Sequence, residues 1–424
     1  MSTSTVAAAK PSASTARRRT GPMAAGPSPL ERLKARVEGR GAAPAVTFAV
    51  TDVDGVTTVL GDGEAVLRIF IATEPGRAAV CSLSELAIAD AYINEDIDIE
   101  GSLLDAMKLR ELLTNWSPTV RVWSQLKPVL VGRRRCNPGW IAKHYDADNV
   151  QFIAMDADHR IYTPGLYASD DDTLEDGAER RLAMIYDTLG LAAGETLLDV
   201  GCGWGGLMRH CARRGVRPTG ISLSRHQVEF ARRRFAEEGL TATVLYQDFF
   251  SFEPHQRFDA ITVMGVLEDI SDYRIVMRRL ADWIKPGGRV YLDFAAAYRR
   301  LGISPFVTRY VWPGKFRMVY MPQLIGAINR SSFDIVELRN DRHNYHLWTR
   351  KGYERTTERH REVLAASDER MWRTLRMLYA GCAHIFGPTS TRATAYRMLL
   401  QAQSAPPGLL TVSSQPAERP PAEI

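Results

Sequence analysis

A glycine-rich segment that contains one aspartate, LLDVGCGWGG at residues 197–206, is where this sequence most clearly predicts chemistry. Its glycines have the GxGxxG spacing between a predicted strand and a predicted helix, a spacing that nicotinamide and flavin folds also use. Asp199 stands two residues before the first glycine, where a carboxylate can bind the ammonium of a methionine group. The acidic residue of a dinucleotide site, expected about 20 residues later, is missing. The segment therefore favours S-adenosylmethionine over a dinucleotide, or over a turn that only serves packing.

A second aspartate lies at the end of another predicted strand. Asp248, within YQDFF, suits recognition of an adenine amino group. The alternative is that its carboxylate caps the helix that follows.

Alternating strands and helices position these residues. We expect an α/β fold, a Rossmann-like class I methyltransferase with a doubly wound, mostly parallel sheet, which binds ligands at the carboxyl ends of its strands. The predicted strands are 195–201, 216–224, 242–247, 258–266 and, after a turn at KPGG (285–288), 288–295; the predicted helices are 177–191, 204–215 and 224–239.

A small α+β domain is predicted before this sheet. Strands at 45–50, 55–60 and 65–72 precede helices at 82–93 and 102–113. The predicted organisation is a disordered tail at 1–28, an α+β domain at 40–125, a methyltransferase domain at 126–402 with a lid insertion near 300–325, and a disordered tail at 403–424.

Composition and charge exclude several classes of protein. The 424 residues are 45% hydrophobic and 24% charged, with a formal net charge of +5. The five cysteines form no CxxC pair, so we expect neither a disulfide framework nor a metal centre. We predict a cytoplasmic protein, because no apolar run is long enough to span a bilayer and no signal peptide is evident. We also expect no nucleic-acid partner. The oligomeric state stays open.

The ordered motifs resemble a specific family. LDVGCGWGGL, GISLSRHQ, YQD and an upstream HYD-x-x-N-x-x-F at 144–152 are similar to cyclopropane-fatty-acyl-phospholipid synthases and mycolic acid methyltransferases, over about residues 140–400. The branch that makes 10-methyl (tuberculostearic) fatty acid is suspected. The resemblance implies methylation of the double bond of an unsaturated acyl chain of a phospholipid. The product is a cyclopropane, or a methylene branch that a reductase partner converts to a methyl branch.

The resemblance also implies the residues that contact the cofactor. These are Tyr162, Thr163, Leu198, Asp199, Gly201, Gly203, Trp204, Gly205, Gly206, Ser222, Gln227, Gln247 and Asp248.

The predicted catalytic region departs from the family pattern. Glu268 and Tyr345 match family residues, but Pro164 replaces a cysteine that holds bicarbonate and Asp293 replaces a histidine. An anion beside Glu268 and Asp293 would be repelled by two like charges. We therefore doubt that bicarbonate is bound in the usual way, and expect Glu268 or Asp293 to act as the base. A moved base favours a methylene or methyl branch over a cyclopropane.

Each of these residues also has a structural alternative. Glu268 could cap the helix that begins near Asp272, Asp293 could pair with a cation, and Tyr345 could belong to the core. Cys382 matches an active-site cysteine of the family, and we expect it to line the pocket, because the reaction needs no thiolate nucleophile.

The predicted lid combines aromatic and basic side chains, including Arg309, Lys315 and Arg317. This mixture suits the surface of an anionic phospholipid membrane, so we expect peripheral binding to the inner membrane face. The arginines at 133–135 fit the same role or a solvated loop. Two other functions remain open, a methyltransferase for another small molecule and a non-catalytic protein that binds cofactor or lipid.

Overall fold

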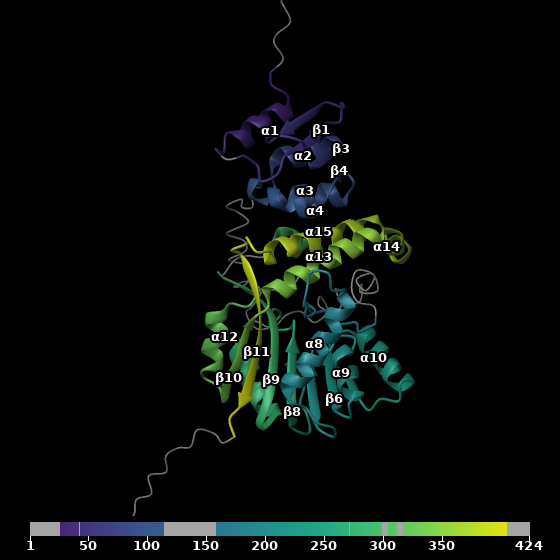
Figure 1. The fold of residues 1–424 in the computed structure, drawn as a ribbon, viewed down its shortest axis with the longest axis vertical. Helices are drawn as coiled ribbons and strands as arrows, with labels where there is room; N and C mark the ends of the chain where they lie inside the picture. The colour runs from purple at the N-terminus through teal and green to yellow at the C-terminus, as the bar shows by residue number, and fades with distance from the viewer. Residues whose placement is uncertain are drawn as a thin grey trace, which may run out of the picture.

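The computed structural model describes residues 26–41, 43–113, 158–270, 272–298, 304–311 and 317–404. Within these ranges a small α+β domain is stacked on a larger domain built around a long sheet, with a layer of helices between them (Figure 1). The predicted HYD motif, the arginines at 133–135, Lys315 and almost all of both predicted tails lie outside the described residues.

A four-stranded sheet in the order β2-β1-β3-β4 forms the N-terminal domain. Three strands were predicted; β4 was not, because only four residues pair and half of them are exposed acids. The elements are α1 (Pro29–Glu38), β1 (Phe48–Thr51), β2 (Thr57–Leu60), β3 (Leu67–Ile71), α2 (Glu74–Ser82), α3 (Glu85–Ile93), β4 (Ile97–Glu100), α4 (Leu103–Lys108) and the 3-10 turn η1 (Leu109–Leu112).

Helix α1 lies before the predicted start of this domain at residue 40 but packs into its core. Its apolar residues Leu30, Leu33 and Val37 are buried there. Ser28 begins the helix through a capping box with Glu31, a signal that the sequence contains.

The larger domain has the predicted doubly wound, mostly parallel sheet, in the order β10-β11-β9-β8-β5-β6-β7. Strands β5 to β9 run parallel to one another, and β11 and β10 extend the sheet beyond β9 as antiparallel strands. The strands are β5 (Thr196–Val200), β6 (Arg217–Ser222), β7 (Thr243–Tyr246), β8 (Phe258–Met264), β9 (Ile284–Ala297), β10 (Phe333–Asn340) and β11 (Ala393–Ala402). The turn predicted at 285–288 was wrong: it is an irregularity within β9.

Helices cover both faces of this sheet, as the alternation of buried residues shows. Leu197 packs in one cluster with α8 (Leu174–Leu189) and α9 (Gly206–Ala212). Leu198, the next residue, packs in another cluster with α11 (Tyr273–Trp283) and α12 (Met321–Ile328). Helix α10 (Arg225–Glu237) lies over β6 and β7.

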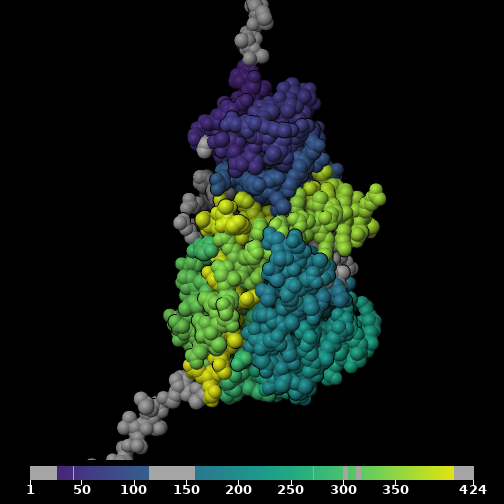
Figure 2. Space-filling view, in the orientation of Figure 1, coloured from purple at the N-terminus to yellow at the C-terminus, as the bar shows by residue number. Residues whose placement is uncertain are grey.

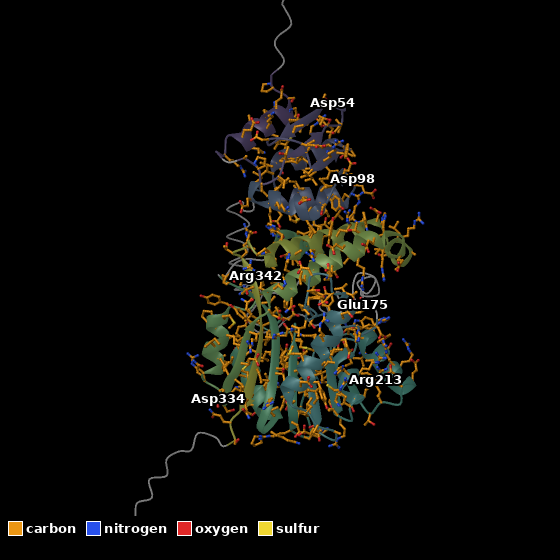
Figure 3. All side chains as sticks on the ribbon, viewed as in Figure 1. Asp54, Asp98, Glu175, Arg213, Asp334 and Arg342 are labelled. Atoms are coloured by element: carbon orange, nitrogen blue, oxygen red, sulfur yellow. The ribbon has the colours of Figure 1, made fainter. Side chains whose placement is uncertain are left out.

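Three C-terminal helices, α13 (Arg342–Glu358), α14 (His360–Ala366) and α15 (Glu369–Phe386), form the layer between the two domains (Figure 2). Arg373 donates hydrogen bonds to the backbone of Tyr92 at 3.1 Å and to Asp98 at 3.2 Å on the N-terminal side. Arg355 pairs with Glu175 of α8 at 2.6 Å on the opposite side. Figure 3 shows Asp98 and Glu175 above and below this layer. These contacts fix the two domains against each other.

The described parts of the predicted lid lie against both domains. Residues 304–311, which include the π-helical turn η2 (Val307–Val311), pack on the N-terminal domain, where the Tyr310 hydroxyl donates to Asp90 at 2.7 Å. Arg309 pairs with the same aspartate at 3.3 Å. Residue Val319 follows the edge of β9 by bonding to Ala295. None of the helices in the described ranges is long and apolar enough to cross a membrane.

Candidate active site

A pocket of about 160 Å³ opens at the carboxyl ends of β5, β6, β7 and β8. The predicted residues that line it are Tyr162, Thr163, Asp199, Gly201, Gly203, Trp204, Gly206, Ser222, Gln227, Gln247 and Asp248. Leu198 and Gly205 do not line it: Leu198 points into the core, and Gly205 begins α9 with its α-carbon facing Phe235. The structure therefore brings most of the predicted cofactor residues together.

Two glycines of the turn are required by close approaches. Gly201 has φ of 74°, and a β-carbon there would lie 2.3 Å from a methyl group of Val266. A β-carbon on Gly206 would lie 2.2 Å from the carbonyl oxygen of His159. Gly206 thus lets the segment around Tyr162 close over the start of α9 and form a wall of the pocket.

Asp199 presents an uncompensated oxygen to this pocket. Its side chain is buried, and the Thr262 hydroxyl donates to Oδ1 at 2.7 Å. Oδ2 accepts no hydrogen bond from any residue that the structure describes. Burial raises the pKa of Asp199 to about 6. A ligand ammonium beside Oδ2 would satisfy this oxygen and favour its ionised form.

Asp248 combines the two roles that the sequence left open. Its Oδ1 accepts the backbone N–H of Phe250 at 2.7 Å, which caps the turn after β7, while the residue still lines the pocket. The hydroxyl of Ser222 donates a 2.9 Å hydrogen bond to Oε1 of Gln227, and both residues line the pocket.

A second, larger cavity of about 360 Å³ adjoins the first. The two cavities share the lining residues Tyr162, Thr163, Gly265 and Asp269. Ligands bound in the two cavities can therefore contact each other at this shared wall. The second cavity is lined mainly by apolar side chains and also contains Pro164, Glu268, Tyr345 and Cys382.

Glu268 is the carboxylate best placed for chemistry. The backbone N–H of Ala295 donates to its Oε1 at 2.7 Å, while Oε2 has no hydrogen-bond partner among the described residues. Burial raises the pKa of Glu268 to about 8. The helix-capping alternative was wrong, because Asp272 caps α11 through the N–H of Arg274.

Asp293 does not line either cavity, and it has the cation partner that was the alternative reading. It lies within β9 with no exposed surface and pairs with the equally buried Arg181 of α8. Arg181 also pairs with Asp341 at 2.6 Å. Burial raises the pKa of Asp293, and the guanidinium of Arg181 opposes that shift.

Tyr345 connects this ion cluster to the cavity. Its ring packs against Phe386, and its hydroxyl donates to Asp293 at 3.1 Å. Burial raises the pKa of this hydroxyl well above its usual value. Burial also raises the pKa of the Cys382 thiol to about 12, so the thiol is neutral. Cys382 lines the second cavity, as predicted.

The comparisons with known proteins agree with this geometry. The family model for mycolic acid cyclopropane synthetase matches residues 134–394. The chain belongs to this family. A probable fatty acid methyltransferase of Mycobacterium tuberculosis is 26% identical over 339 residues, which cover 71% of this chain and 78% of the relative. The cyclopropane-fatty-acyl-phospholipid synthase of Escherichia coli is 32% identical over 184 residues, 41% of this chain and 46% of that synthase.

Solved structures of the family have the same fold. The cyclopropane synthase MmaA2 of Mycobacterium tuberculosis superposes with a TM-score of 0.58 at 20% identity, covering 62% of this chain and 98% of that one. As a member of the cyclopropane synthetase family, the chain is an S-adenosylmethionine-dependent methyltransferase that acts on lipids.

The residues of the first pocket fit S-adenosylmethionine. Oδ2 of Asp199 can accept the methionine ammonium, and Asp248 and Gln247 lie where the adenine is expected. The methyl group of a bound cofactor would then lie beside the wall that both cavities share, which is formed by Tyr162, Thr163, Gly265 and Asp269.

Replacing Asp199 by asparagine is expected to weaken binding of S-adenosylhomocysteine by about tenfold or more, because a charge-assisted hydrogen bond to the ammonium is lost. Calorimetric titration measures the change. Methylthioadenosine, which lacks the amino-acid group, serves as the matched control ligand and should lose little affinity. An equal loss for both ligands would mean that Asp199 only supports the fold of the pocket.

Some site residues were not assigned from the sequence. Asp269 lines both cavities, and burial raises its pKa to about 7, but it was not predicted as a site residue. Arg181 and Asp341 gave no signal, because their partners are remote in the chain.

Proposed function

We propose that this chain methylates the double bond of an unsaturated, oleoyl-type acyl chain of a phospholipid, with Glu268 as the base, and that the product is a methylene-branched chain. The observation that supports this proposal is the bare Oε2 of Glu268 in an apolar cavity that adjoins the cofactor pocket. An acyl chain is the kind of substrate that such a cavity accepts.

Bound S-adenosylmethionine supplies an activated methyl group, and its transfer to one alkene carbon leaves positive charge on the other. The carboxyl group of Glu268 lies in a dry, low-dielectric site. In its ionised form, which predominates above its pKa of about 8, its negative charge stabilises a cation strongly. Oε2 can then take the proton, while the N–H of Ala295 holds Oε1 in place. The aromatic ring of Tyr345 forms part of the wall around the same region.

The surroundings of Glu268 favour removal of a proton by the carboxylate itself. Pro164 stands in the cavity wall where relatives of the family have a cysteine, and Asp269 adds a second carboxyl group nearby. In their ionised forms these two carboxyl groups repel a bound bicarbonate anion. Loss of a proton from the new methyl group would close a cyclopropane directly. A 1,2-hydride shift that first moves the positive charge to the methyl-bearing carbon lets loss of a proton from the same methyl group give a methylene branch. The similarity to a probable fatty acid methyltransferase supports methyl transfer to an acyl chain.

The membrane and the reductase are further parts of this proposal. A phospholipid substrate requires the protein to bind the membrane surface, and a methyl-branched final product requires a separate hydride-donating reductase. The exposed Arg309 side chain is already paired with Asp90, so membrane binding through the lid would rest on other residues as well.

The decisive experiment incubates the protein with vesicles of dioleoyl phosphatidylglycerol and methyl-labelled S-adenosylmethionine, followed by mass spectrometry of the acyl chains. We expect label in a methylene-branched chain. Vesicles of the saturated distearoyl lipid are the matched control and should take up no label. A labelled cyclopropane would refute the proposed branched product, and cofactor binding without any labelled lipid would refute the proposed substrate.

A further inference from the structure

The larger cavity does not end within the methyltransferase domain. Its lining continues into the N-terminal domain, which lies before the first residue that the family model matches. The lining residues from this domain include Leu33 of α1, Phe48 of β1, Leu67 and Ile69 of β3, Val80 of α2, Ile88 of α3 and Ile99 of β4. The family model therefore does not cover this part of the cavity.

The inner face of the four-stranded sheet forms the floor of this hollow. Phe48 lies opposite Leu67, and Ile69 lies opposite Ile99, in adjacent paired positions of the sheet. The neighbouring inward residues Leu60 and Ile97 are fully buried in the core and do not line the hollow. Cores of small domains are normally packed without voids larger than a water molecule, so a hollow at this apolar face suits an apolar ligand.

We propose that the hollow in the N-terminal domain binds the methyl-terminal part of the substrate acyl chain. This inference rests on the proposed function, and it assigns the N-terminal domain the task of measuring how far the chain extends beyond the double bond.

The distribution of polar groups determines which end of the chain enters. The polar side chains Thr163, Glu268 and Asp269 lie at the end of the cavity that meets the cofactor pocket. The lining side chains from the strands of the N-terminal sheet are all apolar. A methyl terminus loses no hydrogen bonds there, whereas an ester or a phosphate group would be left unsatisfied.

Charged residues near the hollow do not contradict this direction. Glu85 and Arg110 line the cavity beside the segment 304–311, but they pair with each other at 3.0 Å. Arg392 also lines the cavity, from the methyltransferase domain, and is exposed. An exposed arginine suits the region near a phosphate head group rather than the apolar end.

The test compares three phospholipids whose acyl chains separate the two directions. Palmitoleoyl and oleoyl chains are equal on the carboxyl side of the double bond, and oleoyl is two carbons longer on the methyl side. A cis-vaccenoyl chain equals palmitoleoyl on the methyl side and is two carbons longer on the carboxyl side. Ile69→Phe adds bulk to the hollow, and Phe70→Trp, on the exposed face of the same strand, is the matched control.

We expect Ile69→Phe to lower the rate with oleoyl lipid relative to palmitoleoyl lipid by about tenfold or more. A difference of one or two methylene groups changes the rate by about this factor when the pocket fits the chain closely. The rate with cis-vaccenoyl relative to palmitoleoyl lipid should stay unchanged, as should all ratios in Phe70→Trp. Selective loss of cis-vaccenoyl activity, or no change in either ratio, would overturn the inference.

A second variant covers the case in which Ile69→Phe does not fold. Ile69→Ala enlarges the hollow and should raise the rate with oleoyl relative to palmitoleoyl lipid, and unchanged ratios would again overturn the inference. Failure of the proposed function is distinguishable, because the wild-type protein would then methylate none of the three lipids.

Discussion

Replacing Glu268 by glutamine is expected to lower the rate of methyl transfer to lipid by about 10²- to 10⁴-fold, the usual contribution of a general base. Glutamine retains an oxygen that can accept the N–H of Ala295, so the fold of the cavity should be preserved. It cannot take a proton or stabilise a cation with a negative charge. Single-turnover transfer of the labelled methyl group to oleoyl lipid measures the effect.

Affinity for S-adenosylhomocysteine distinguishes a catalytic role of Glu268 from a structural one. Glu268 lines the second, larger cavity and not the cofactor pocket, so the glutamine variant should bind S-adenosylhomocysteine as the wild type does. A parallel loss of affinity and turnover would contradict the assignment. A strong increase of wild-type activity on addition of bicarbonate would also contradict it, because the base would then be the added anion.

Glu268→Gln, which should lower the rate, is expected to raise the stability of the folded protein relative to the wild type as the pH rises. The pKa of Glu268 is about 8 in the folded protein, above its ordinary value of 4.5. The folded state therefore holds a proton that the unfolded state has lost, and stability falls as the pH rises through this interval. Glutamine has no such dependence, so the melting temperature of the variant minus that of the wild type should grow between about pH 5 and about pH 8.5. A constant difference would mean that Glu268 is ionised at little cost in the folded protein.

The cofactor pocket could be predicted from the sequence because its residues are local in the chain. Asp199 and the glycines lie within a few residues of one strand end, and Ser222 and Asp248 end the two neighbouring strands. Parallel strands bring their carboxyl ends to one edge of the sheet, so these short segments meet without further information.

The role of Asp293 could not be predicted in this way. Its partner Arg181 is 112 residues away, in the middle of α8 within GAERRL, where an arginine reads as part of a solvated helix face. The hollow in the N-terminal domain was equally hidden. Residues such as Phe48 and Ile69 have the pattern of an ordinary strand core, and a sequence specifies side-chain types without showing where they leave space.

Replacing Arg181 by methionine is expected to lower the free energy of unfolding by about 3–5 kcal/mol, the cost of leaving a buried charge without its partner. Arg181 has no exposed surface and pairs with both Asp293 and Asp341, and Arg397 reaches Asp341 at 3.4 Å. Its removal leaves two buried carboxyl groups with one remaining cation. Denaturant unfolding of the variant measures the loss.

The double variant Arg181→Met, Asp293→Asn should regain much of this stability, since the amide needs no counter-charge and can still accept the hydroxyl of Tyr345. If the double variant instead loses as much unfolding free energy as the two single variants together, the two side chains are not coupled.

The double variant also decides between the two candidate bases. If Asp293 removed the proton, the double variant would be folded but inactive. Because Asp293 lies behind Tyr345 and outside both cavities, we expect the double variant to transfer methyl groups to lipid with Glu268 unchanged.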